Sequence, residues 1–189
     1  MSFFSNLPQI ISFFGNTSQR LNRYAYVQNN PVNFFDPNGQ WSTPIHNRII
    51  GRAFSYLPEN LIREIEQGSK FADSSEFQAA KFNHMHAMRQ KGESLESENS
   101  KMQAYIKDHM TNFSIFKQDG QLEKAYFELG MGLHPIMDST SPSHTGFQVW
   151  DGFLNTPGYE LIRHWYLERT ISESQIETTV GLINKAMNE

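Results

Sequence analysis

The chain has 189 residues, enough for one compact domain with a hydrophobic core of its own. Its 16 Lys and Arg residues against 20 Asp and Glu residues give a formal net charge of −4, which excludes an overall positive field for holding a polyanion such as nucleic acid. The absence of cysteine excludes disulfides and thiolate metal sites, so any metal ligands must be His, Asp, Glu or backbone groups.

Residues 1–40 have the composition of loops and turns. "QNNP" and "DPNG" are strong turn signals, and no helical period is present. The start, "MSFFSNLPQIISFF", is apolar in patches but lacks a cationic region and contains Pro8. We therefore expect neither a cleavable signal peptide nor a transmembrane helix, and we place the start of the folded domain near residue 41.

Residues 41–189 show helical periodicity. Thr43 can cap a first helix that has Pro44 at its first position. Further helices are expected over 59–67 (ending at Gly68), over 97–116, from about 122 to 138, and over 157–169. Ser172 and Gln175 have the spacing of a capping box that opens a last helix. No stretch after residue 41 has the period of a strand, so we predict a compact all-α domain.

Two histidine–carboxylate pairs have a spacing of four residues. The pairs are His134 with Asp138 and His164 with Glu168, and His144 lies six residues beyond Asp138, after a Ser-Pro break. Side chains four residues apart on a helix project from one face about 6 Å apart, which is near the span of two ligands on one metal ion. The alternative for an isolated pair is a surface salt bridge or a histidine satisfied inside the core.

Three upstream residues complete the set of candidate ligands: His46, Asp73 and His86. Each is a weak candidate alone, since Asp73 could equally cap a helix. His84 and His86 in "HMHAMR" compete for the same role, and the sequence leaves that choice open.

The order of these residues resembles that of the zinc-dependent phospholipase C family and the related single-strand-specific zinc nucleases. The family pattern is an N-terminal Trp, a His on the first helix, an Asp, a further His, the unit His-x3-Asp-x5-His, and a closing His-x3-Glu or His-x3-Asp. The matching residues here are Trp41, His46, Asp73, His86, His134, Asp138, His144, His164 and Glu168. The stretch "FELGMGLHPIMDSTSPSH" is also similar to the family signature around its central ligands.

This resemblance implies up to three zinc ions. One would bind Asp73, His86, His134 and Asp138, and another His144, His164 and Glu168. The third would bind His46, the same Asp138, and the α-amino nitrogen and carbonyl oxygen of Trp41. The resemblance also implies a catalytic role for Asp73, which would orient the attacking water or take its proton.

Residues 22–40, "NRYAYVQNNPVNFFDPNGQ", resemble the end of the core region of Rhs/YD-repeat proteins, where self-cleavage releases a C-terminal toxin. The resemblance divides the chain into a core-boundary segment, 1–40, and a toxin domain, 41–189. The expected cut between Gln40 and Trp41 would supply the α-amino group, with a pKa of about 8, that the third zinc site requires. The alternative is that Trp41 is only a buried anchor. An Rhs shell, an immunity protein and delivery as a secreted effector are implied.

Phospholipid is the expected substrate, because "LGMGLHPIMD" and the closing His-x3-Glu unit are closer to the phospholipases than to the nucleases. The Trp-x4-His spacing in "WSTPIH" is instead similar to the nucleases, and Ser74 follows Asp73 where the phospholipases have Tyr. A single-strand-specific nuclease is thus one alternative. The other is an interaction module in which zinc is purely structural.

Overall fold

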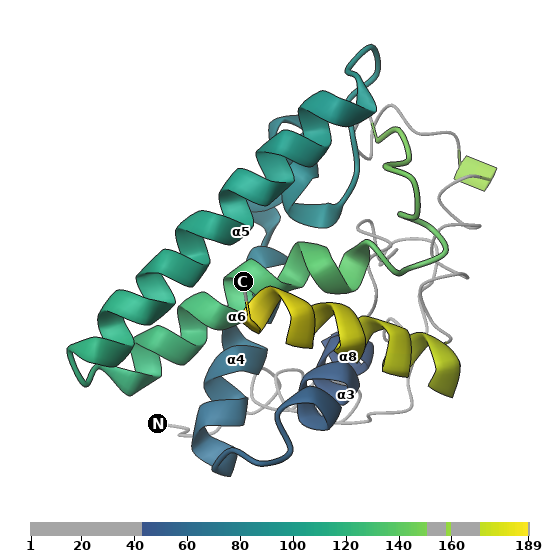
Figure 1. Ribbon diagram of the computed structural model, residues 1–189. Coiled ribbons are helices and arrows are strands. Elements are labelled where there is room, and N and C mark those ends of the chain that lie inside the picture. Colours follow the sequence, from purple (N-terminus) through teal and green to yellow (C-terminus); the bar gives the residue numbers. More distant parts are fainter. Residues whose placement is uncertain (1–42, 151–157, 160–170, 189) are drawn as a thin grey trace, which may run out of the picture. The chain divides into compact units, whose positions relative to one another are not determined.

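The computed structural model describes residues 43–150, 158–159 and 171–188, all within one compact unit, Asn38–Glu189. These residues are mostly helical and contain no strand, which confirms the predicted all-α domain (Figure 1). The α-helices in this part of the chain are α3 (Thr43–Ala53), α4 (Glu59–Ala72), α5 (Leu95–Gln118), α6 (Leu122–Asp138) and α8 (Glu173–Asn188). Two 3₁₀ segments, η2 (Ser75–Phe77) and η3 (Ala80–His86), lie between α4 and α5.

Helix α6 is the central element of the domain. It packs against α3, α4, α5, α8 and η3, and every residue from Leu129 to Asp138 is buried (Figure 1). The main core cluster combines apolar side chains of α3, α4, α5, α6 and α8. A smaller cluster of Ala72, Met85 and Met131 joins α4, η3 and α6. The C-terminal half of α6 is therefore surrounded by protein, and its polar side chains must find partners there.

Capping hydrogen bonds are described at the starts of α5 and α8, whereas Thr43, predicted as the cap of the first helix, is the first residue of α3. Helix α5 begins after Ser94, whose Oγ accepts a hydrogen bond from the backbone N–H of Ser97 at 3.1 Å. At α8 the predicted capping box is confirmed: the Gln175 N–H donates to Ser172 Oγ at 3.3 Å, and the Ser172 N–H donates to Gln175 Oε1 at 2.9 Å. The predicted helix over 157–169 falls outside the described residues except at 158 and 159.

The predicted end of the second helix at Gly68 is wrong, because α4 continues to Ala72. Gly68 does not cap the helix. It lies at the crossing of α4 and α6, where an added Cβ would overlap the carbonyl oxygen of Phe127. Gly130 of α6 has the reciprocal position, since a Cβ there would overlap the carbonyl oxygen of Ile65. Two glycines thus allow the backbones of α4 and α6 to approach closely.

No helix in the described ranges is long and apolar enough to cross a membrane.

Replacing either crossing glycine by alanine should destabilise the fold. We expect Gly68→Ala and Gly130→Ala each to lower the free energy of unfolding by about 1–3 kcal/mol, since a methyl group has no space between the two backbones. Gly51 of α3 and Gly181 of α8 are matched controls, because nothing lies within 4 Å of a Cβ at either position. Alanine at these two positions should stabilise the protein by about 0.5–1 kcal/mol.

Urea unfolding followed by circular dichroism measures all four variants. A Gly68→Ala protein as stable as Gly181→Ala would contradict the close approach of the two helices.

Candidate metal centre

Six of the nine predicted ligands lie in the described part of the chain, and the structure brings them together. They are His46, Asp73, His86, His134, Asp138 and His144. Their side chains are at most 2% exposed, except that of Asp73, which is 12% exposed. The other three, Trp41, His164 and Glu168, fall outside the described residues, so their predicted roles stay predictions.

Three helices converge on the centre. His134 and Asp138 lie one turn apart at the end of α6, so both side chains point to the same side of that helix. His46 comes from the buried face of α3. Asp73 is the residue after α4 and forms its C-cap, with its backbone N–H donating to the carbonyl oxygen of Lys70 at 3.2 Å. These ligands are therefore positioned by helices or their ends, whereas His144 lies in the turns that follow α6.

The structure answers which histidine of "HMHAMR" joins the centre. The ring of His86 lies against that of His134, with 5.1 Å between the ring centroids. The ring of His84 instead faces Tyr105 of α5, at a centroid distance of 6.0 Å. His86 is the last residue of η3, where the chain turns through Ala87 in a left-handed conformation (φ 51°).

His86, His134 and Asp138 offer three potential ligand atoms at the mutual spacing of a metal shell, and Asp73 lies next to two of them. His134 Nε2 lies 3.1 Å from Asp73 Oδ1, 3.1 Å from Asp138 Oδ2 and 3.1 Å from His86 Nδ1. His86 Nδ1 lies 3.3 Å from Asp138 Oδ2 and 3.9 Å from Asp73 Oδ1. A tetrahedron with metal–ligand bonds of about 2.0–2.1 Å has edges of about 3.3–3.4 Å. These buried groups could therefore hold a metal ion.

A second group of ligands shares residues with the first. Asp138 directs Oδ2 towards His86 and His134, and its other oxygen, Oδ1, lies 3.0 Å from His46 Nε2. His46, Asp73 and His134 also form a candidate group, in which His46 Nδ1 lies 3.8 Å from Asp73 Oδ2. His144 Nδ1 lies 3.8 Å from Asp138 Oδ2. The Asp138 carboxylate thus lies between two sets of imidazoles, as a bridging ligand would.

Burial and charge act in opposite directions on these groups. Burial alone lowers the pKa of His134, but the carboxylates of Asp138 and Asp73 outweigh it and raise that pKa to about 10. Burial raises the pKa of Asp138, but His134 and the hydrogen bonds from the imidazoles outweigh it and hold the pKa well below its ordinary value. Burial lowers the pKa of His144 to about 4. The buried carboxylate is therefore ionised, and its charge must be balanced by a proton or by a cation.

Ser69 is a further residue of the centre. Its hydroxyl is buried, and Oγ lies 3.2 Å from His134 Nδ1 and 3.4 Å from His46 Nδ1. Since the Nε2 atoms of both rings face Asp138, a metal would bind at Nε2, and both Nδ1 atoms would then carry the proton. One hydroxyl oxygen can accept from both N–H groups and so fix both tautomers and ring orientations.

The sequence reasoning missed Ser69 because it ended the second helix at Gly68. Ser69 lies four residues before Asp73, so the two share one face of α4 once the helix is known to continue. The i,i+4 spacing that indicated His134 and Asp138 was therefore present on α4 too.

No protein-family model, curated protein or solved structure matches this chain. The interpretation of the centre accordingly depends on its geometry and on the spacing of the motifs.

The His84 and His86 pair offers a matched test of zinc binding. We expect His86→Ala to weaken zinc binding more than about 100-fold, because it removes a ligand, while His84→Ala leaves the affinity within about threefold. Equilibrium dialysis with elemental analysis gives the affinity and the number of ions bound. The zinc-induced rise in melting temperature should be lost in His86→Ala alone. Equal effects of the two changes would contradict the assignment.

Ser69→Ala should weaken zinc binding by about 10–100-fold, because the imidazoles of His46 and His134 lose the acceptor that orients them. The stability measured with a chelator present should change little. Ser100→Ala is the control, since that exposed hydroxyl donates only to the backbone oxygen of Glu96. Imidazole ¹⁵N shifts would report the tautomers directly, and unchanged shifts with unchanged zinc affinity would rule out this role.

Proposed function

We propose that this chain is a zinc-dependent phosphodiesterase and that phospholipid is its substrate. The observation that carries the proposal is the close spacing of three buried ligand atoms from His86, His134 and Asp138, with Asp73 Oδ1 3.1 Å from His134 Nε2. A set of donors rich in imidazole favours zinc, whereas magnesium and calcium prefer shells of oxygen atoms. The order of these residues along the chain, which resembles that of the zinc-dependent phospholipases, supports the same conclusion.

Bound zinc would supply water that ionises near neutral pH and positive charge for the phosphodiester group. The chain's own residues would hold the ion and accept the proton. Asp138 and His134 are fully buried and hold the ligand framework in place. Asp73 has the greatest exposure among the described ligands, and one of its carboxylate oxygens can accept a proton from an attacking water. We therefore assign the role of general base to Asp73.

Phospholipid is preferred over nucleic acid for two reasons. The net charge of −4 gives no overall attraction to a polyanion, whereas a single phosphodiester headgroup does not require one. The closing unit of His164 and Glu168 has the form found in the phospholipases. Zinc as a purely structural ion is the remaining alternative, and the exposure of Asp73 argues against it, because a closed structural site needs no ligand that is open to solvent.

The proposal includes release from an Rhs-type protein by cleavage between Gln40 and Trp41, with delivery as a secreted effector and an immunity protein as partner. The contact of 3.0 Å between His46 Nε2 and Asp138 Oδ1 supports the ligand group that a new α-amino terminus at Trp41 would complete. Cleavage and metal loading would then be linked, because a peptide nitrogen cannot serve as an amine ligand.

Zinc-loaded protein should release water-soluble phosphorylated headgroup from phospholipid vesicles and leave single-stranded DNA intact. We expect Asp138→Asn to lower the rate by more than about 100-fold, because that carboxylate contacts His46, His86 and His134. Asp108→Asn, a change of an exposed carboxylate on α5, should leave the rate unchanged.

Headgroup release and DNA digestion are measured on the same preparation, with the zinc content determined in parallel. Digestion of DNA without headgroup release would show that the protein is a nuclease and not a phospholipase. A protein that contains zinc but has neither activity would make the ion structural.

A further inference from the structure

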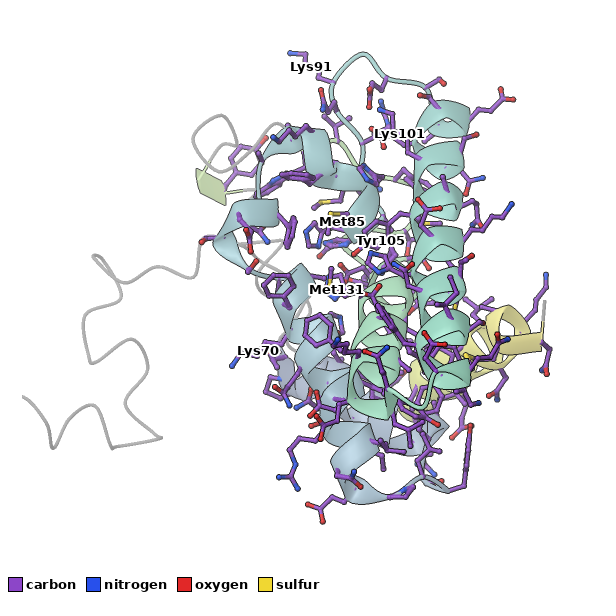
Figure 2. All side chains as sticks on the ribbon, turned by 90° about the vertical axis from the view of Figure 1, so that its left-hand side faces the viewer. Lys70, Met85, Lys91, Lys101, Tyr105 and Met131 are labelled. Carbon is purple, nitrogen blue, oxygen red and sulfur yellow. The ribbon has the colours of Figure 1, made fainter. Side chains whose placement is uncertain are left out.

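Four phenylalanine rings form a continuous row on the surface of the domain. Phe82 packs on Phe77 with 5.4 Å between ring centroids, Phe77 on Phe71 at 5.5 Å, and Phe71 on Phe127 at 5.6 Å. The rings come from η3, η2, α4 and α6, and we call them the phenylalanine row. Beneath it lies the small core cluster that contains Met85 and Met131, side chains that lie close together between η3 and α6 (Figure 2).

The rings of the phenylalanine row are only partly covered by the rest of the domain. All four rings are partly exposed, and Phe71 is 42% exposed. Single exposed apolar side chains are ordinary, and Tyr56 and Leu95 are examples in the described ranges. A contiguous apolar row is different, because it costs solvation unless another apolar surface covers it.

Two lysines accompany the row, Lys81 at Phe82 and Lys70 next to Phe71 in sequence. The Nζ of Lys81 lies 4.6 Å from the centre of the Phe82 ring. Lys70 precedes Phe71 in sequence, is exposed, and projects away from the ribbon (Figure 2). Within the described ranges neither lysine pairs with a carboxylate, and the nearby Glu76 accepts a hydrogen bond from Ser74.

The Phe127 end of the row is mainly acidic. Glu64, Glu123 and Glu128 surround Phe127 there, with Lys124 between them. A partner that meets the row must therefore offer anionic groups above an apolar layer at the Phe82 end and tolerate acidic groups at the Phe127 end.

The row adjoins the solvent-exposed ligand of the metal centre. Phe71 precedes Asp73 by two residues, and Phe77 follows it by four. Asp73 caps α4 at the point where the chain enters η2. Any surface that covers Phe71 and Phe77 would therefore be held beside the ligand that we assign as general base.

We propose that the phenylalanine row is a docking surface for a phospholipid bilayer. Phe71 and Phe77 enter the boundary between headgroups and acyl chains, and Lys70 and Lys81 bind lipid phosphate groups beside the row. Such a bilayer supplies both things the row requires, an apolar layer and phosphates above it. This inference rests on the proposed function, since it places the lipid substrate beside the metal centre.

Vesicle sedimentation with the full chain tests the proposal. We expect binding to phosphatidylcholine vesicles that increases when phosphatidylglycerol is added. Phe71→Ala and Phe77→Ala should each lower the partition coefficient by roughly 3- to 10-fold, in proportion to the ring area removed from lipid. Tyr56→Ala, which removes a ring that is 74% exposed elsewhere, is the matched control and should not change it.

Charge variants test the lysines separately. Lys70→Gln with Lys81→Gln should remove most of the increase caused by phosphatidylglycerol, whereas Lys107→Gln on α5 should not. Circular dichroism melts establish that each variant is folded. Wild-type protein that does not bind vesicles, or folded Phe71→Ala and Phe77→Ala variants that bind like wild type, would overturn the proposal. So would oligothymidylate binding that depends on Phe71 without vesicle binding, because the rings would then stack on bases.

Hydrolysis of a monomeric short-chain phospholipid separates this inference from the proposed function. Variants that lose vesicle binding but hydrolyse the monomeric lipid at the wild-type rate support both. Vesicle binding that depends on Phe71 without any hydrolysis supports the docking surface and refutes the enzyme. Hydrolysis of the monomeric lipid without vesicle binding refutes the docking surface alone.

Discussion

The close approach of α4 and α6 is the constraint on which the rest of the structure depends. Gly68 and Gly130 each place a bare Cα against the carbonyl group of the other helix, at positions where any side chain would overlap it. Ser69, Asp73, His134 and Asp138 follow these glycines along the two helices and belong to the centre. A separation of the axes by even one methyl group would move Ser69 and Asp73 away from His134 and lengthen its contacts with both.

The centre also imposes a cost on the fold. The carboxylate of Asp138 is fully buried, and transferring a charge from water into protein is unfavourable unless it is compensated nearby. The imidazoles of His46, His86 and His134 provide that compensation only when one of them is protonated or when all of them share a cation. Binding of a metal ion at this centre would therefore be coupled to folding, and the apparent stability would then depend on the supply of metal.

Local periodicity predicted the helices and the pair of His134 and Asp138, whereas His46, Asp73 and His86 were selected through the resemblance of their order to that of the zinc-dependent phospholipases. The spacing of His134 and Asp138, and the capping box of Ser172 and Gln175, involve residues within one helical turn, and the structure has both arrangements. The same kind of pattern gave a wrong helix end at Gly68. A glycine after an apolar stripe indicates either the end of a helix or a close crossing, and only the position of a second helix distinguishes the two.

Two further features depended on the path of the chain in three dimensions. Ser69 was missed because the predicted end of α4 removed it from the face it shares with Asp73. The choice between His84 and His86 could not be made from spacing, because two residues in a 3₁₀ segment face different neighbours only once α5 and α6 flank it. Patterns within one helix were thus sufficient to predict a shared helix face or a cap. Contacts between different elements could not be predicted from them.

The exposed fraction of the side chains increases from the buried side of the centre towards Asp73. This difference determines which of its residues a molecule in solution could reach. Asp138 and His134 have no exposed area, Asp73 is 12% exposed, and Phe71, two residues before it, is 42% exposed. Because the buried end is enclosed by α3, α4 and α6, its residues can orient an ion but cannot meet a large substrate directly. Within the described part of the domain, the side of Asp73 is therefore the side from which the proposed substrate would approach. The residue proposed as general base is the ligand that water and lipid would reach first.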